Sequence, residues 1–364
     1  MVVIIKPTYL CNFKCKYCYL TDETKVSHKL DVTLAKSALQ QIKESRIANS
    51  IQKLTVIWHG GEPLLWGIDN YRDIFEFMER EFKDIEYKNS MQTNLSLINE
   101  KFIDLFLKYN VHVGFSLDGT KDIHDLQRVN HEGKGTFDTI MEKVTLCRDK
   151  GLSMGCIVVA TKKHIGKISE LYDFMCNSNI NFKFNPLFNA GEAAKNEDEF
   201  SLSPDEYAKM SIELFDLWFY DKKHQNRNST FIEIASNIIT RRPSGCLFGK
   251  NCQKNFMAIS PNGDVFPCGR FCDYDFAEYS YGNLNEVKLI DILPRIKKSD
   301  FYKRYEYIEA SSCKRCEFFD ICHGGCMHDG FVESGNLKSK TFLCGAYKQI
   351  FTHIQKRLKD AELM

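Results

Sequence analysis

The sequence predicts an α/β protein: a partial (β/α)6 TIM-like barrel, then a small cysteine-rich domain and a C-terminal helix. Three observations support this fold. Strand-like and helix-like segments alternate about every 30 residues through the first half, which is typical of a parallel sheet curled into a barrel. The cysteines of the second half fall between residues 244 and 344, and the residues after them have helical spacing. A chain of 364 residues has room for both domains.

Six strand-like segments in the first half are expected to form the strands of the barrel. They are Val2–Lys6, Lys53–Trp58, Tyr87–Thr93, Val111–Ser116, Met154–Ala160 and Asn181–Asn185. The segments between them carry apolar residues at helical spacing, as in the stripe that begins at Tyr71, and Gly151 is placed to cap the helix before the fifth strand. Because such folds place their chemistry at the carboxyl ends of the strands, the loops after these runs are candidate site loops.

The chain changes character after Pro186. The segment Ser203-Pro204-Asp205-Glu206 combines an N-cap, a proline at the first helical position and a glutamate three residues on, which predicts a helix start. Asn262-Gly263, between two apolar runs, predicts a hairpin turn. We therefore expect four parts. They are a barrel over residues 1–186, a helical bridge over 187–243, a cysteine-rich domain over 244–344 and a C-terminal helix over 345–364.

Composition excludes several classes of function. The formal net charge of +1 gives no reason to expect a nucleic-acid or membrane-surface partner. No apolar stretch approaches the length of a bilayer span, and no export signal precedes the first strand. In a large chain of this kind, fifteen cysteines indicate metal ligands in a reducing compartment more than disulfides. We expect a cytoplasmic metalloprotein.

Three cysteines directly after the first strand, Cys11, Cys15 and Cys18, are the most informative residues. Iron–sulfur clusters usually take four cysteines, so a compact group of three would leave one iron of a four-iron cluster open to a small molecule. A partial zinc site is the alternative, but structural zinc needs four ligands and this loop offers no histidine. The three cysteines therefore predict a catalytic cluster.

The arrangement Cys11-x3-Cys15-x2-Cys18, with Tyr17 before the third cysteine, resembles that of the radical S-adenosylmethionine (radical SAM) enzymes. The resemblance implies a [4Fe–4S] cluster whose open iron binds S-adenosylmethionine through its amine and carboxylate. Reduction would then cleave the sulfonium and release a 5′-deoxyadenosyl radical that takes a hydrogen atom from the substrate. In such enzymes the cofactor carries the hard chemistry, and the protein supplies position.

The residues expected to bind S-adenosylmethionine follow the later strands. Trp58-His59-Gly60-Gly61-Glu62-Pro63 resembles the family segment that binds the methionyl amine, and glycines let a backbone approach a ligand closely. By resemblance, Ser116 and Arg128 would hold the methionyl carboxylate, since arginine suits a planar anion. The remaining cofactor-binding predictions are Tyr17, Asn94, Asp118 and Ile157. Asn94 and Asp118 have the alternative role of capping a turn, and Ile157 that of a core residue.

Eight further cysteines could form two four-thiolate sites. Cys313-x2-Cys316-x5-Cys322-x3-Cys326 alone could equally be a zinc knuckle, and spacing leaves the pairing open. With Pro261–Cys268 and Gly324-Gly325-Cys326, the region resembles the SPASM extension, whose members bind two auxiliary [4Fe–4S] clusters. The resemblance implies three clusters in all. One auxiliary cluster would use Cys246, Cys252, Cys268 and Cys326, and the other Cys313, Cys316, Cys322 and Cys344.

Two further residues keep open roles. Cys272 could line the substrate cavity or simply be buried, and His59 could contact the substrate or belong only to its loop.

The reaction is open between two kinds of maturase. Anaerobic sulfatase-maturating enzymes share the compact architecture. They carry an aspartate that serves as a base after the cysteine that matches Cys268, whereas this chain has Gly269. We therefore predict a maturase that oxidatively crosslinks a ribosomally made precursor peptide, through a cyclophane-type carbon–carbon bond or a thioether. One alternative is a sulfatase-maturating (formylglycine-generating) enzyme, and another is a non-enzymatic iron–sulfur or zinc protein. The resemblance also implies a low-potential electron donor such as flavodoxin or ferredoxin.

Overall fold

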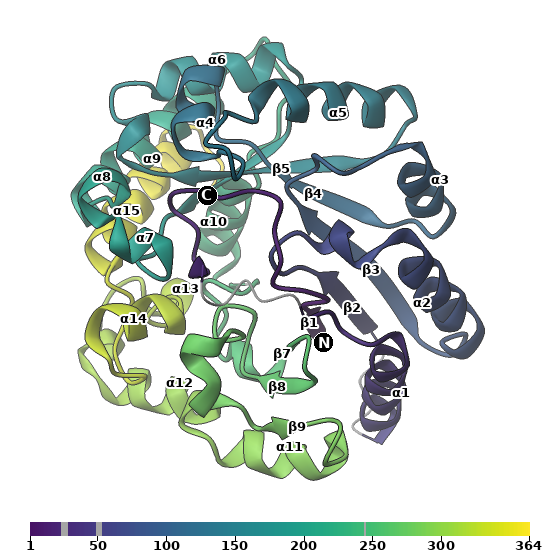
Figure 1. Ribbon diagram of the computed structural model, residues 1–364. Coiled ribbons are helices and arrows are strands. Elements are labelled where there is room, and N and C mark those ends of the chain that lie inside the picture. The colour runs from purple at the N-terminus through teal and green to yellow at the C-terminus, as the bar shows by residue number, and fades with distance from the viewer. Residues whose placement is uncertain (23–27, 49–52, 244) are drawn as a thin grey trace.

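The computed structural model of the chain describes residues 1–22, 28–48, 53–243 and 245–364. Its centre is one nine-stranded sheet in the order β6-β5-β4-β3-β2-β1-β7-β8-β9 (Figure 1). The strands of the first half are all parallel to their neighbours. They are β1 (Val2–Ile5), β2 (Lys53–Trp58), β3 (Glu86–Thr93), β4 (His112–Ser116), β5 (Met154–Ala160) and β6 (Phe182–Pro186). Each lies within one residue of its predicted bounds at either end, and the predicted fold class is confirmed.

Helices connect these parallel strands and cover the outer face of the sheet (Figure 1). They are α1 (Val32–Ala48), α2 (Ile68–Glu81), α3 (Glu100–Lys108), α4 (Lys121–Gln127), α5 (Phe137–Asp149) and α6 (Ile168–Asn177). The stripe that begins at Tyr71 is buried, as its spacing predicts. Gly151 follows the end of α5 with φ +77°, a left-handed conformation that favours glycine.

The second half extends the same sheet. The strand β7 (Phe256–Ile259) pairs in parallel with β1, and β8 (Asp264–Phe266) and β9 (Gly282–Asn283) continue it in antiparallel pairs. The second half also contains nine α-helices in the described ranges. They are α7 (Glu192–Lys195), α8 (Glu197–Phe200), α9 (Pro204–Tyr220), α10 (Ser229–Thr240), α11 (Leu289–Lys298), α12 (Asp300–Ala310), α13 (Phe319–Cys322), α14 (Met327–Ser334) and α15 (Cys344–Asp360). The division into four parts stays a prediction.

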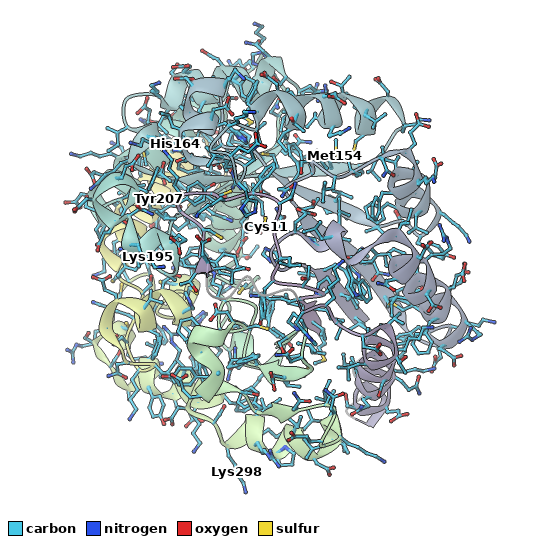
Figure 2. The ribbon with its side chains drawn as sticks, in the orientation of Figure 1. Cys11, Met154, His164, Lys195, Tyr207 and Lys298 are labelled. Atoms are coloured by element: carbon cyan, nitrogen blue, oxygen red, sulfur yellow. The ribbon has the colours of Figure 1, made fainter. Side chains whose placement is uncertain are left out.

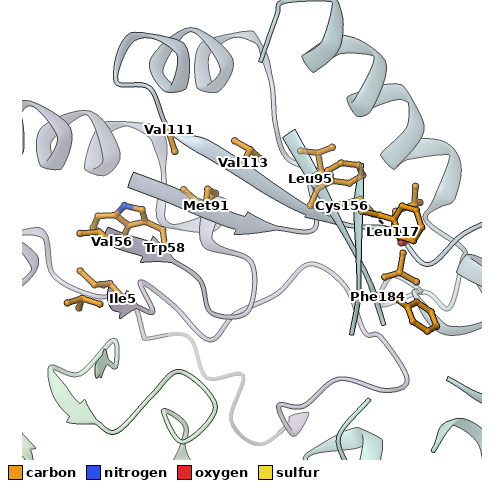
Figure 3. Close-up of a cluster of buried hydrophobic side chains, with 14 of the residues drawn as sticks. Ile5, Val56, Trp58, Met91, Leu95, Val111, Val113, Leu117, Cys156 and Phe184 are labelled. Atoms are coloured by element: carbon orange, nitrogen blue, oxygen red, sulfur yellow. Dashed lines mark hydrogen bonds between the residues drawn. The ribbon is translucent and has the colours of Figure 1, made fainter. Parts of the chain in front are cut away.

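The main core lies between the parallel sheet and its helices (Figure 3). Trp58 at the end of β2 is fully buried, and its ring stacks on Trp66 at 5.6 Å and meets the edge of Tyr71 at 5.5 Å. Pairs of this geometry stabilise a core beyond the area they bury. The core thus fixes the chain immediately before the loop that begins at His59. No helix in the described part of the chain is long and apolar enough to span a membrane.

A buried lysine joins the first strand to the cysteine-rich region. The Nζ of Lys6, directly after β1, donates to the carbonyl of Cys272 at 2.5 Å, and the Tyr9 hydroxyl donates to the same oxygen at 3.0 Å. The ammonium also lies 5.0 Å from the centre of the Tyr19 ring. Burial acts to lower the pKa of Lys6, but Tyr19 and Cys272 raise it, and the net pKa is raised. Lys6 is therefore a charged group that holds the end of β1 in place.

Candidate active site

A cavity of about 500 Å³ lies at the carboxyl ends of the strands, between the barrel and the C-terminal region. Figure 2 labels Cys11 near the centre of the molecule, in the loop that follows β1. Two predicted cysteine sets line this one cavity. From the N-terminal loop these are Cys11, Cys15 and Cys18, and from the cysteine-rich region Cys246, Cys252, Cys268 and Cys326. The structure therefore brings the predicted catalytic cysteines and one predicted auxiliary set to the same space.

The two glycines after β2 support the N-terminal cysteine loop by close backbone contact. The N–H of Gly61 donates to the carbonyl of Thr8 at 3.0 Å, and that of Glu62 to the carbonyl of Leu10 at 2.7 Å. A Cβ on Gly61 would lie 2.2 Å from the Leu10 oxygen and 2.3 Å from that of Tyr9. These are backbone atoms, so the cysteine loop itself would have to move. Glycine is required here because the loop passes directly over it.

Gly61→Ala is expected to displace the cysteine loop and reduce loading of the N-terminal cluster, because the added methyl group collides with the loop backbone. Anaerobic iron analysis and electron paramagnetic resonance should show loss of that cluster, with the auxiliary signals retained. Gly155→Ala is the matched control, since its added Cβ would meet only His112 Nε2, at 3.7 Å. Equal iron loading in both variants would contradict the assigned role of Gly61.

Glu62 does not line the cavity; its carboxylate points into the protein. It is fully buried and accepts from the Thr93 hydroxyl at 2.6 Å, from Asn94 N–H at 2.7 Å and from Leu64 N–H at 3.0 Å. Burial raises the pKa of Glu62 to about 7, against the lowering effect of these three hydrogen bonds. The side chain thus ties the end of β2 to the end of β3. The carboxylate of Glu62 is thus engaged within the protein, and the binding of the cofactor by Glu62 stays a prediction.

Arg128, Asp118 and Tyr17 form one buried network beside the cavity. Arg128 Nε donates to Asp118 Oδ2 at 2.7 Å, and the Tyr17 hydroxyl donates to the same oxygen at 2.5 Å. Gln127 and the N–H of Val159 also donate to this carboxylate. Arg128 and Tyr17 line the cavity, whereas Asp118 is fully buried behind them. Asp118 is therefore placed to hold Arg128 in position, and Arg128 to meet an anion in the cavity.

The other predicted cofactor-binding residues also lie on the cavity wall. Gly60, Gly61, Asn94, Ser116 and Ile157 are among its lining residues. Asn94 Nδ2 lies 3.8 Å from the Cys11 sulfur and donates to Asn12 at 2.9 Å, so its amide belongs to the cysteine loop as well. The Ser116 hydroxyl accepts from Gln92 at 3.3 Å. Of the predicted cofactor-binding residues, only Glu62 and Asp118 do not line the cavity.

The remaining predicted ligands line a second cavity of about 210 Å³, nearer the surface. We call it the outer cavity; its lining includes Cys313, Cys316, Cys322 and Cys344. The predicted sorting of the eight cysteines into two sets thus coincides with two separate cavities. Cys322 and Cys326 lie four positions apart, one on each cavity, so the turn between them separates the two sets.

The donor chemistry around both cavities fits iron–sulfur clusters. Burial raises the pKa of the Cys322 thiol and of the Cys326 thiol to about 12, so a metal charge is needed to hold them as thiolates. Arg304 lies between the sets, near Cys252 and Cys326 of one and Cys313 and Cys322 of the other. Its buried Nε has no hydrogen-bond partner among the described residues. Anionic clusters on either side would provide the missing partner.

Several cavity residues were not predicted from the sequence. The Arg270 guanidinium forms an ion pair with the buried Asp329 and lies 3.4 Å from the Cys326 sulfur. It also stacks 4.3 Å from the centre of the Phe188 ring, which in turn meets His328 at 5.0 Å. These residues come from three distant segments, and only Arg270 had a sequence signal, its position two residues after Cys268.

His59 and Cys272, whose roles the sequence left open, differ in whether they line the cavity. His59 lines it, and its Nδ1 accepts from the N–H of Gly60 at 2.7 Å. Burial lowers the pKa of His59 to about 3, so the imidazole is neutral. Cys272 is fully buried and does not line the cavity; its carbonyl holds Lys6.

Comparison with known proteins identifies both halves. The Radical SAM superfamily model matches residues 5–175, and an iron–sulfur cluster-binding (SPASM) domain matches residues 246–317. A cysteine-type anaerobic sulfatase-maturating enzyme of Clostridium novyi (strain NT) is 29% identical over 96% of this chain and 94% of its own. The solved structure of native anSMEcpe with bound AdoMet and Cp18Cys peptide has a TM-score of 0.84 at 22% identity, covering 99% of this chain and 98% of its own. Streptococcus suis SuiB bound to precursor peptide SuiA has a TM-score of 0.64 at 18% identity, covering 94% and 75%.

These comparisons make the prediction of a peptide-crosslinking maturase wrong. A relative that aligns over almost its whole length is a sulfatase-maturating enzyme, and the precursor-peptide maturase matches the fold less closely. Gly269, at a single position, is weaker evidence than this similarity along the entire chain. The predicted family is confirmed. The chain is a radical SAM enzyme that carries a C-terminal SPASM domain.

Proposed function

We propose that this enzyme matures a sulfatase-type substrate: it oxidises the β-carbon of a cysteine in a peptide to an aldehyde, giving formylglycine. The observation that carries the proposal is the single cavity lined by both the N-terminal cysteines and the inner auxiliary set. A substrate side chain in this space would lie between a hydrogen-abstracting centre and an electron acceptor. The resemblance to cysteine-type sulfatase-maturating enzymes supports the substrate class.

The proposed reaction balances as a two-electron oxidation. When bound, S-adenosylmethionine and three [4Fe–4S] clusters supply hydrogen-atom abstraction and electron acceptance. The β-carbon loses a hydrogen atom, and the side chain then loses one electron and the thiol proton to become a thioaldehyde. Water converts the thioaldehyde to the aldehyde and releases hydrogen sulfide. A low-potential donor such as flavodoxin or ferredoxin would supply the electron for each cleavage, which suits a reducing cytoplasm.

The chain's own residues would position the reactants. Cys11, Cys15 and Cys18 would hold the catalytic cluster, and Arg128 would bind the methionyl carboxylate while Asp118 fixes its orientation. Charge-assisted hydrogen bonds of this kind are stronger than neutral ones and give directional binding. Cys246, Cys252, Cys268 and Cys326 would hold the inner auxiliary cluster, and Cys313, Cys316, Cys322 and Cys344 the outer one.

The cavity differs from the sulfatase-maturating pattern at Gly269. A Cβ at this position would meet the side chain of Ile4 at 2.9 Å, and both residues line the cavity. A side chain at position 269 would therefore require the end of the Ile4 side chain to shift. We infer that this enzyme removes the substrate proton without a carboxylate at that position.

A cysteine-containing peptide of sulfatase type is expected to gain an aldehyde when incubated anaerobically with the reconstituted enzyme, S-adenosylmethionine and a reductant. Mass spectrometry after hydrazide capture would detect the aldehyde, with one 5′-deoxyadenosine per product. Deuterium placed on the cysteine β-carbon should appear in the 5′-deoxyadenosine. The same peptide with alanine at that position is the control. Cofactor cleavage with neither aldehyde nor deuterium transfer would refute the proposal, and transfer with a new intramolecular crosslink would return the assignment to a crosslinking enzyme.

A further inference from the structure

The outer cavity has a positively charged rim. Its charged lining side chains are Arg315, Lys340 and Lys348, all exposed, and no carboxylate is among its lining residues. None of the three makes an ion pair within the described parts of the chain. Because the whole chain carries a formal net charge of only +1, this concentration is local.

The positive surface continues into an adjoining cavity, which shares Phe319 with the outer one. Arg241, Lys250 and Lys314 line it, together with the carboxylates of Glu309 and Asp320. Glu309 is paired with Lys314 at 2.7 Å, so one carboxylate and one lysine cancel there. We call Arg315, Lys340 and Lys348 the basic rim, since they are the unpaired cations at the outer cavity itself.

The need to stabilise the cysteine thiolates does not account for the exposed cations of the basic rim. Groups that stabilise buried thiolates act best from a buried position, where the dielectric is low. Arg304 has that position, between the two cysteine sets and 8% exposed. Exposed cations act instead on the field outside the protein, where they attract an anionic partner over about a Debye length.

The basic rim lies directly above a continuous route to the substrate cavity. Cys322 on the outer cavity and Cys326 on the inner one are separated by His323-Gly324-Gly325. Arg304 spans the same turn, since its Nη2 donates to the carbonyl of Gly324 at 3.4 Å. An electron delivered at the rim would therefore have only this short segment between the outer and the inner cysteine sets.

We propose that the basic rim docks an acidic one-electron carrier protein, which exchanges electrons with the outer auxiliary cluster. The inference rests on the proposed function in one respect, that Cys313, Cys316, Cys322 and Cys344 hold a redox-active cluster. Small electron-transfer interfaces depend on charge complementarity for their association rate more than on buried area. The carrier is identified by its acidic surface and single-electron chemistry.

The test uses the anaerobically reconstituted full-length enzyme and its triple variant R315E/K340E/K348E. Stopped-flow absorbance follows cluster reduction by flavodoxin hydroquinone, without peptide or S-adenosylmethionine, at low and high ionic strength. The matched control K88E/K101E/K108E makes the same change in formal charge at exposed lysines of β3 and α3, on the opposite side of the molecule (Figure 1). Titanium(III) citrate, a small reductant, measures cluster competence independently of docking.

At low salt, the second-order rate constant for cluster reduction by flavodoxin is expected to be lower in the rim variant than in the wild type by about tenfold or more. This difference between the two enzymes should shrink as salt rises. The control and the titanium rates should match the wild type. Equal flavodoxin rates in the two variants would overturn the proposal, as would a parallel loss with titanium or of iron content. Because the assay contains no peptide, a negative result would overturn the docking proposal without bearing on aldehyde formation.

Discussion

Replacing Cys11, Cys15 and Cys18 together by alanine is expected to abolish reductive cleavage of S-adenosylmethionine. The three thiols line the cavity from one loop, and among the predicted ligands no others belong to the catalytic cluster. Iron should fall from about twelve to about eight atoms per chain, because two complete four-cysteine sets are untouched. The measurements are 5′-deoxyadenosine formation, by chromatography, and iron and sulfide content.

Cys147→Ala is the control for this loss. Cys147 is fully buried in α5 and lines neither cysteine cavity, so the variant should keep all its iron and its cofactor cleavage. Retained cleavage in the triple variant, or a wild-type enzyme that contains zinc alone, would contradict the assigned catalytic cluster.

Asp118→Ala is expected to destabilise the protein by about 3–5 kcal/mol, since it leaves the buried Arg128 charge without its partner. The change also removes the acceptor for Tyr17, Gln127 and the N–H of Val159. Anaerobic urea unfolding would measure the loss. Affinity for S-adenosylmethionine should fall as well, because Arg128 would no longer be held at the cavity wall. The exposed ion-pair carboxylate Asp69, changed to alanine, is the control and should cost little.

The same network makes a prediction about pH. Burial acts to raise the pKa of Asp118, but Arg128 and His124 outweigh it, so the pKa is lowered. A lowered carboxyl pKa adds stability above the unfolded pKa of about 3.9, and that stability is lost as pH falls through the folded value. The difference in unfolding free energy between wild type and Asp118→Ala should therefore narrow in acid. A difference that is constant down to the folded pKa would show that Asp118 is not the charged partner.

The strands β1, β2 and β5 were predictable because a buried parallel strand is rich in apolar residues. The strands β3 and β6 contain more polar residues, and the regular recurrence of strand–helix units supported their placement. The helices α10, α11 and α12 were not predicted individually, and their places depend on tertiary contacts: α10 packs on β6 and α15, and α11 packs on α1 and α12. The loops of the site were predictable for a different reason: a parallel sheet brings the ends of its strands to one edge. Sequence therefore located the cavity without showing its shape.

Side-chain direction could not be read from the sequence. The resemblance implies that Glu62 binds the cofactor, but nothing in the sequence shows that its carboxylate accepts from three donors inside the protein, two of them at the end of β3. Arg270 and Asp329 likewise meet only in the folded chain, although 59 positions separate them. Such contacts depend on tertiary packing, which local patterns do not encode.

The reaction was mispredicted because the absence of one side chain was read as the absence of a function. Gly269 lacks a carboxylate, and a Cβ there would meet the side chain of Ile4, which is far away in sequence. The two residues form one packing unit of the cavity wall. The sequence argument considered position 269 alone, and the similarity to a sulfatase-maturating enzyme along almost the entire chain outweighs it.

The pairing of β1 with β7 has a consequence for how the protein is made. The first strand to leave the ribosome must wait for a partner more than 250 residues later, since Val2 lies opposite Phe256. Until then one edge of β1 presents unpaired backbone groups, a known route to aggregation. Contacts of such sequence separation also slow folding. A truncated barrel alone would keep this edge open permanently, so biogenesis should depend on synthesis of the whole chain, and on chaperones that shield the nascent strand.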